Sequence, residues 1–149
     1  AEKGELKKST RTIKEIIVHC SATPEGKDYT LDTIRQWHLQ RGFSDIGYHY
    51  VIHPDGKVEE GRDVNIAGAH CSGHNSKSIG ICYIGGMTAD NKKAKDTRTD
   101  AQKRALRNLL EDLHKRYPKA LIVGHCDLEP RKPHCPGFNV VGEYRDLQP

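Results

Sequence analysis

The sequence predicts an α/β fold with a mixed central β-sheet flanked by helices. Two short apolar runs, 16–18 and 121–123, are each followed by a histidine within two residues and are typical of buried strands. A Pro-Asp-Gly turn at 54–56 separates two further strand-like segments, which predicts a hairpin. Apolar residues recur at helical spacing from 105 to 117, as on the buried face of an amphipathic helix.

The length and composition indicate one domain without a membrane-inserted part. We expect a polar N-terminal segment over 1–12 and a single domain over 13–149, which is long enough to bury a core. No apolar run approaches the roughly 20 residues of a membrane span. The net charge of +4 is modest, and the basic residues are scattered rather than interleaved with aromatic ones. We therefore expect no nucleic-acid partner.

The first elements follow from local signals. A strand is predicted over 13–20, followed by a loop over 21–28 that contains a proline and a glycine. A helix is predicted over 30–41, with Thr30 as its N-cap and Gly42 at its end. Trp37 lies on the apolar face of this helix, so we expect it in the core.

The hairpin is predicted to pair 47–52 with 57–60. Because side chains alternate along a strand, Tyr48, Tyr50 and Ile52 should share one face. The remaining elements are a long polar loop over 62–77, a buried strand over 78–84, a charged connection over 85–98, an amphipathic helix over 100–117 and a short helix beginning near Asn139. A Thr-x-x-Gln capping box at residues 99–102 supports the start of the long helix.

One stretch, 123–138, brings three candidate metal ligands together: His125, His134 and Cys135. Imidazole nitrogen and thiolate sulfur are ligands that zinc prefers, and a catalytic zinc keeps three protein ligands and one open position. His19 ends the other apolar run and is a candidate ligand from a neighbouring strand. At this level His134 and Cys135 remain alternatives.

The other cysteines are expected to stay outside the metal site. If His19 and His125 face one site from strands, Cys20 and Cys126 point to the opposite face. Five cysteines form no pattern of paired spacings, which favours free thiols in a reducing compartment. A second metal at His70 and His74 is a weaker alternative.

Several motifs, in one order along the chain, resemble the zinc-dependent N-acetylmuramoyl-L-alanine amidases of type 2, which share their fold with peptidoglycan recognition proteins. The small phage lysozymes with amidase activity are the most similar group. The matching motifs are Ile17-Val-His-Cys-Ser-Ala-Thr23, Ile34-Arg-Gln-Trp-His38, Asp45-Ile-Gly-Tyr-His-Tyr-Val-Ile52, Ser78-Ile-Gly80 and the segment from His125 to Phe138. The resemblance implies a zinc cleft over one face of the sheet.

The resemblance also implies roles for single residues. It selects Cys135 over His134, because the family places its third ligand just before a Pro-Gly or similar pair, so the zinc ligands would be His19, His125 and Cys135. Zinc-bound water would attack the amide carbonyl, Lys132 would stabilise the oxyanion and Tyr48 would assist. His70 and Asn75 are expected to contact the substrate, because they lie in the long polar loop over 62–77, which we expect to form a wall of the substrate site.

The implied substrate is peptidoglycan or a muropeptide, cut at the amide between N-acetylmuramic acid and L-alanine. We expect a monomeric phage or prophage-type lysin that is cytoplasmic until its release to the cell wall, with a secreted or periplasmic location as the alternative. Two other functions are kept open. One is a recognition module that binds peptidoglycan without cutting it, and the other is an amidase that also inhibits a polymerase.

Overall fold

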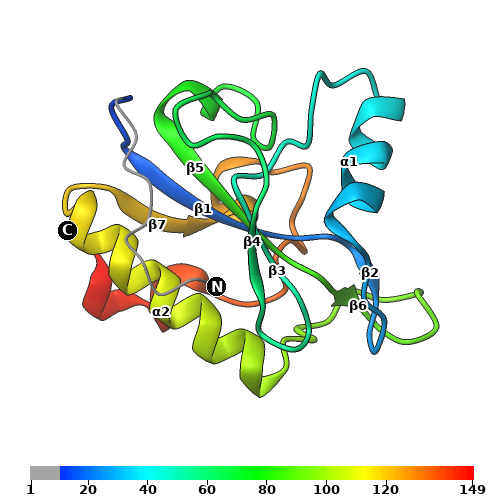
Figure 1. Cartoon of the computed structure of the whole chain (residues 1–149). Coiled ribbons are helices and arrows are strands. Elements are labelled where there is room, and N and C mark those ends of the chain that lie inside the picture. The colour runs from blue at the N-terminus through cyan, green and yellow to red at the C-terminus, as the bar shows by residue number, and fades with distance from the viewer. Residues whose placement is uncertain (1–10) are drawn as a thin grey trace.

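The computed structural model describes residues 11–149 and contains a five-stranded mixed sheet with helices on both faces (Figure 1). The strands are β1 (Glu15–Cys20), β2 (Thr23–Pro24), β3 (Tyr50–Ile52), β4 (Val58–Glu60), β5 (Ser78–Tyr83), β6 (Gly86–Met87) and β7 (Leu121–Gly124). The helices are α1 (Leu31–Gln40), η1 (Asn75–Lys77), α2 (Asp100–Arg116), α3 (His125–Leu128), α4 (Val140–Glu143) and η2 (Arg145–Leu147). The predicted N-terminal segment 1–12 lies outside the described residues except for its last two.

The order of strands in the main sheet is β4-β3-β5-β1-β7, so β1 is flanked by β5 and β7. All neighbours pair in parallel except β3 and β4, which form the predicted antiparallel hairpin. The parallel strands β1, β5 and β7 therefore end at the same edge of the sheet. Open α/β sheets commonly bind ligands beyond these carboxyl ends.

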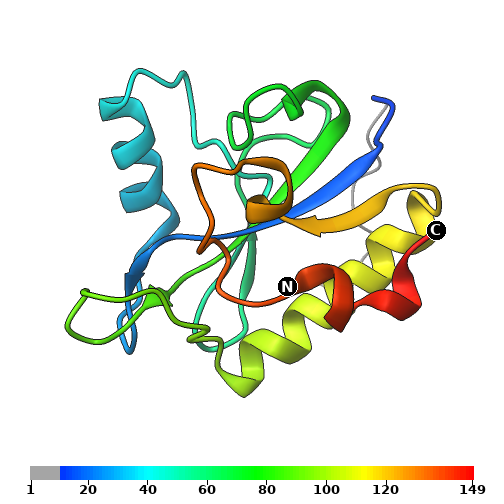
Figure 2. The same cartoon turned by 180° about the vertical axis from the view of Figure 1, so that it is seen from behind.

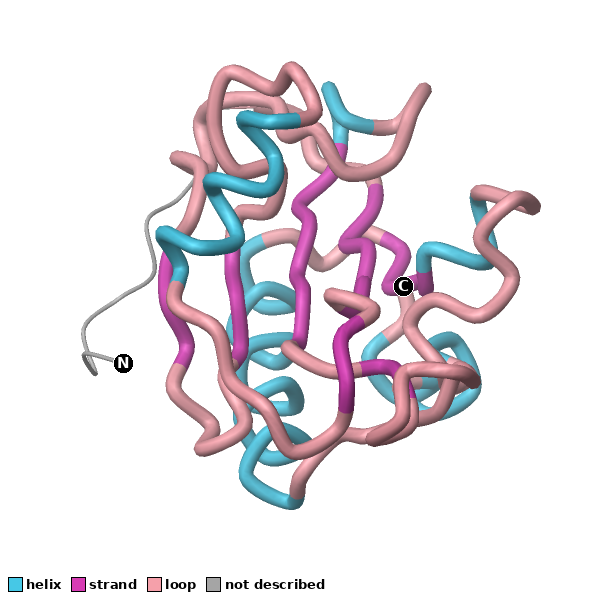
Figure 3. The backbone as a smooth tube through the Cα atoms, turned by 90° about the vertical axis from the view of Figure 1, so that its right-hand side faces the viewer, coloured by secondary structure: helices cyan, strands magenta, loops and turns pink. Residues whose placement is uncertain are grey.

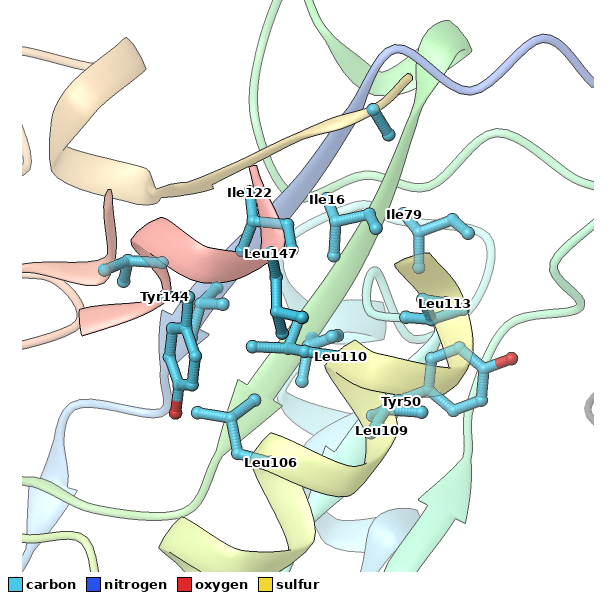
Figure 4. Close-up of a cluster of buried hydrophobic side chains, with 14 of the residues drawn as sticks. Ile16, Tyr50, Ile79, Leu106, Leu109, Leu110, Leu113, Ile122, Tyr144 and Leu147 are labelled. Atoms are coloured by element: carbon cyan, nitrogen blue, oxygen red, sulfur yellow. The ribbon is translucent and has the colours of Figure 1, made fainter. Parts of the chain in front are cut away.

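The larger core lies between the sheet and α2. In Figure 4, Leu106, Leu110 and Leu113 of α2 lie beside isoleucines of β1, β5 and β7. The isoleucines are Ile16, Ile79 and Ile122, which are fully buried. Burying each such side chain contributes roughly 1.5–3 kcal/mol. The capping box predicted for α2 is present, because Thr99 and Gln102 exchange hydrogen bonds of 2.9 and 3.0 Å.

The opposite face of the sheet is covered by α1, as Figure 3 shows from that side. Thr30 caps α1 by accepting a hydrogen bond of 3.1 Å from the backbone N–H of Thr33, as predicted. Ile34 packs with Val51 of β3 in a buried cluster, and Trp37 packs against it. Trp37 is half-buried, so it packs at the edge of the core rather than within it.

Two strand predictions are wrong in detail. β3 begins only at Tyr50, so alternation does not extend back to Tyr48. Tyr50 and Ile52 belong to the α2 core, whereas Tyr48 packs on the α1 side. His125 is not on a strand but begins α3, directly after β7. The short parallel pair of β2 and β6 was not predicted, because two-residue strands carry no periodic signal.

The last segment is anchored to the rest of the fold by Arg98. Its side chain is 2% exposed and pairs with Asp96 and Glu143, with N···O distances of 2.9 and 2.8 Å. The guanidinium also lies 3.4 Å from the ring centroid of Phe138. Arg98 thus connects the start of α2 to the segment that carries Cys135.

Arg98→Met should lower the free energy of unfolding by about 3 kcal/mol, because it leaves two carboxylates without their shared cation. This loss should be at the lower end of the range for breaking a buried ion pair, since both carboxylates are partly exposed. Arg107→Met is the matched control: Arg107 forms exposed pairs with Glu111 and Asp146 and should cost less than about 1 kcal/mol. Chemical denaturation of both variants provides the measurement, and equal losses would contradict the role of Arg98.

No helix within residues 11–149 has the length and apolar character that crossing a lipid bilayer requires.

Candidate active site

The three ligands predicted by resemblance come together at the carboxyl edge of the sheet. One ligand atom each from His19, His125 and Cys135 lies within 4.8 Å of the others. The residues come from β1, α3 and the loop before α4. Among residues 11–149 this is the one group of three or more such side chains close enough to share a metal ion. His134, the alternative to Cys135, lies outside this group. It lines two cavities that contain neither His19 nor His125.

The sheet register brings the two histidines together. β1 pairs with β7 up to Val18 and Gly124, so His19 and His125 are the next residues along neighbouring chains. Their ring centroids are 4.3 Å apart. The N–H of Gly124 donates to the Asp127 carboxylate at 2.8 Å, which fixes the first turn of α3. In Figure 2 the orange segment that begins with α3 lies between α1 and β7.

The segment with Cys135 is held by hydrogen bonds to buried parts of the fold. The N–H of Cys126 donates to the Cys135 carbonyl at 2.9 Å, and the Tyr83 hydroxyl donates to the Pro136 carbonyl at 2.6 Å. The N–H of Cys20 lies 3.2 Å from the Cys135 sulfur and can donate to it. The sulfur is therefore placed by backbone and core contacts rather than by a free loop.

Cys20 lies closer to the site than alternation along β1 suggests. Its side chain belongs to the α2 core, opposite His19 as predicted, yet its sulfur is 3.7 Å from that of Cys135. The contact arises because Cys135 reaches the end of β1 from beyond the sheet edge. Cys20 nevertheless lies outside the group of three ligands.

Burial acts against a charge on each of the three donor groups. Burial, followed by the neighbouring histidines, holds the pKa of His19 well below its usual value. Burial and then the nearby Lys132 lower the pKa of His125. Contact with the Cys20 thiol, together with burial, raises the pKa of Cys135. Two imidazole lone pairs are thus available, and the thiol must lose its proton when a metal binds.

The donor set fits a zinc ion. Two nitrogens and one sulfur are the borderline to soft ligands of zinc, and three protein ligands leave a fourth position for water or substrate. Hard cations such as magnesium prefer oxygen ligands, which this group lacks.

Tyr48 lies beside the ligand group although its strand assignment was wrong. Its ring centroid is 5.2 Å from that of His19, and it lines a cavity of about 190 Å³ together with His125, Lys132 and Cys135. Desolvation raises the pKa of Tyr48 well above its usual value of 10. The hydroxyl therefore keeps its proton and can donate a hydrogen bond, but it is a poor general base.

Lys132 lines the same cavity. Its backbone N–H donates to the Glu129 carbonyl at 2.9 Å, which forms a turn after α3. Its charge is close enough to His125 to lower the pKa of that imidazole. The cavity thus combines one fixed cation, one phenol and the three candidate metal ligands.

A larger cavity of about 570 Å³ continues from this one. The two share Arg41, Phe43, Ala69, His70, His125 and Lys132. The larger cavity also contains Arg131, whose guanidinium pairs with Glu129. Arg41 and Phe43 were not identified from the sequence, since they follow the end of α1 without a recognisable motif. Three cations and one carboxylate make this cavity suited to an anionic ligand.

The predicted substrate contacts His70 and Asn75 line the larger cavity, but their polar atoms have partners within the protein. Asn75 accepts hydrogen bonds of 2.9 Å from the backbone N–H groups of His70 and Cys71. His70 is 9% exposed and contacts His19 and Ser78 through its ring nitrogens. His70 and His74, the weaker alternative for a second metal site, have other partners: His70 contacts His19 and Ser78, and His74 pairs with Glu15.

The chain is similar to known amidases in sequence and in fold. Residues 9–138 match the family described as N-acetylmuramoyl-L-alanine amidase. An endolysin of Klebsiella phage KP32 is 43% identical over 85% of this chain and 82% of its own length. The endolysin of Escherichia phage T7 is 40% identical over 89% and 86%. The solved structure of the amidase LysC from Clostridium intestinale aligns with a TM-score of 0.73 and 26% identity, covering 97% of this chain and 91% of LysC.

Proposed function

Because the chain belongs to the N-acetylmuramoyl-L-alanine amidase family, we propose that it is a zinc-dependent lysin that cuts the amide between N-acetylmuramic acid and L-alanine in peptidoglycan. One observation supports the proposal most strongly. The ligand atoms of His19, His125 and Cys135 lie within 4.8 Å of one another, on a cavity that also contains Tyr48 and Lys132. The match to two phage endolysins supports the lysin role.

The proposed roles divide between the metal and the protein. Zinc, when bound by the three ligands, would make its water acidic and polarise the scissile carbonyl. Lys132 would stabilise the negative charge that develops on the carbonyl oxygen, because it lines the same cavity as the three candidate ligands. Tyr48, which lines the same cavity, would help to orient the reacting groups with its hydroxyl protonated.

The larger cavity supports one orientation of the substrate. The stem peptide carries carboxylates, whereas the glycan side of the scissile bond is neutral. Arg41, Arg131 and Lys132 would therefore receive the peptide. His70 and Asn75, whose polar atoms bind other parts of the protein, would shape this wall rather than hydrogen-bond the ligand through those atoms.

Other aspects of the proposal follow from the family and from the sequence. We propose that residues 13–149 form one catalytic domain, that the protein acts as a monomer and that it reaches the cell wall from the cytoplasm. Peptidoglycan or a soluble muropeptide is the partner, and no nucleic acid is needed for the reaction.

The experiment that tests this function is digestion of purified peptidoglycan by the protein with zinc, and by the same protein after chelation. We expect peptides with a free L-alanine amino terminus, detected by mass spectrometry, only when zinc is present. Re-addition of zinc to the chelated sample should restore the products. Binding to peptidoglycan without release of peptides would contradict an enzyme and favour the recognition module.

A further inference from the structure

His19 contacts a second buried histidine, His70. Its Nε2 atom lies 2.8 Å from Nδ1 of His70, and the two side chains are only 2% and 9% exposed. A hydrogen bond between two neutral imidazoles requires one nitrogen to carry the proton and the other to accept it.

The direction of this hydrogen bond follows from the ligand role of His19. Since Nε2 of His19 faces His70, Nδ1 is the nitrogen left for a metal and must keep its lone pair. The proton then lies on Nε2 and is donated to Nδ1 of His70. His70 must carry its own proton on Nε2, which lies 3.1 Å from the hydroxyl oxygen of Ser78 and can donate to it.

The His70 ring occupies space that two glycines leave open. A Cβ atom added at Gly80 would lie 2.6 Å from Cγ of His70, and one added at Gly68 would lie 2.6 Å from Cδ2. Both distances are shorter than real side-chain contacts. The backbone N–H of His70 is also bonded to Asn75 at 2.9 Å. Two glycines, an asparagine and a serine thus hold one imidazole in a fixed place.

We propose that His70 is a positioning residue that sets the tautomer and orientation of His19, with Ser78 and Asn75 holding His70 in turn. A metal-bound histidine almost always donates its second N–H to a fixed acceptor, and loss of that acceptor typically weakens metal binding by about 10–100-fold. Here the acceptor is an imidazole rather than a carboxylate or carbonyl. The inference rests on the proposed zinc site.

The first test compares zinc affinities in competition with a chromophoric chelator. His70→Ala should bind zinc about 10–100-fold more weakly than the unaltered protein. His70→Asn should recover part of the loss, because its side-chain oxygen can lie near the position of Nδ1. His74→Ala is the matched control: His74 is in the same loop but pairs with Glu15, so its replacement should leave the zinc affinity unchanged.

The second test needs no variant and no activity. Nitrogen-15 NMR of the unaltered protein, metal-free and zinc-loaded, should show the His19 proton on Nε2 and the His70 proton on Nε2. A His19 proton on Nδ1, or a His70→Ala variant that folds and binds zinc as tightly as the unaltered protein, would overturn the inference. Failure of the unaltered protein to bind zinc at all would instead overturn the proposed function.

Discussion

Replacing Cys135 by serine should remove tight zinc binding and lower amidase activity by about 10³-fold or more, since the metal contributes several kcal/mol to the transition state. A serine hydroxyl stays protonated near neutral pH and is a poor zinc ligand. The substitution keeps the size of the side chain and an acceptor for the N–H of Cys20, so the fold should be retained. Zinc content after dialysis and peptide release from peptidoglycan are the two measurements.

Cys126→Ser provides the matched control for this prediction. Cys126 lies nine residues earlier in the same segment, and its side chain is outside the ligand group. It should keep zinc and activity. If Cys135→Ser kept both as well, the third ligand would have to come from elsewhere, and His134→Ala would be the next variant to examine.

The Cys135→Ser variant also separates catalysis from recognition of peptidoglycan. Peptidoglycan binding should depend on the cavity with Arg41, Arg131 and Lys132, which Cys135→Ser leaves unchanged. We therefore expect the variant to sediment with peptidoglycan while releasing no peptides. The protein would then differ from a recognition module by one ligand, which agrees with the resemblance to both groups.

The two longer helices could be predicted because their signals are local. The start of α1 depends on Thr30, and that of α2 on the exchange between Thr99 and Gln102. The face assigned to Tyr48 was wrong for an equally local reason. Alternation holds only within a strand, and β3 begins at Tyr50, three residues after the predicted start at residue 47.

The group of candidate metal ligands could be predicted from the sequence, but its surroundings could not. His19 and His125 each follow an apolar run, and the resemblance selected Cys135. The contact of His19 with His70 depends on a loop folding back over β5, and that of Cys20 with Cys135 joins residues 115 apart in the chain. Neither contact corresponds to a fixed spacing between residues in the sequence, so neither could be predicted from a motif. The shape of the cavity beside Arg41 and Phe43 also depends on packing between distant segments.

Lys132→Ala should lower kcat by about 10²–10³-fold, the usual loss when one group that stabilises an oxyanion is removed. The effect should fall mainly on kcat, because the negative charge on the carbonyl oxygen develops only in the transition state. Zinc content should remain that of the unaltered protein, since Lys132 is not a ligand. Hydrolysis of a soluble muropeptide, followed over a range of substrate concentrations, separates kcat from KM.

Lys119→Ala serves as the control, because Lys119 is an exposed lysine between α2 and β7 and does not line the cavity. It should leave kcat unchanged. A Lys132→Ala variant with a normal kcat and a raised KM would show that this ammonium group binds the carboxylates of the stem peptide instead. Lys132 lines both cavities, so it is placed either to stabilise the oxyanion or to bind a carboxylate of the stem peptide. The proposed role requires that its charge act on the reacting carbonyl. The split between kcat and KM thus decides which cavity Lys132 serves.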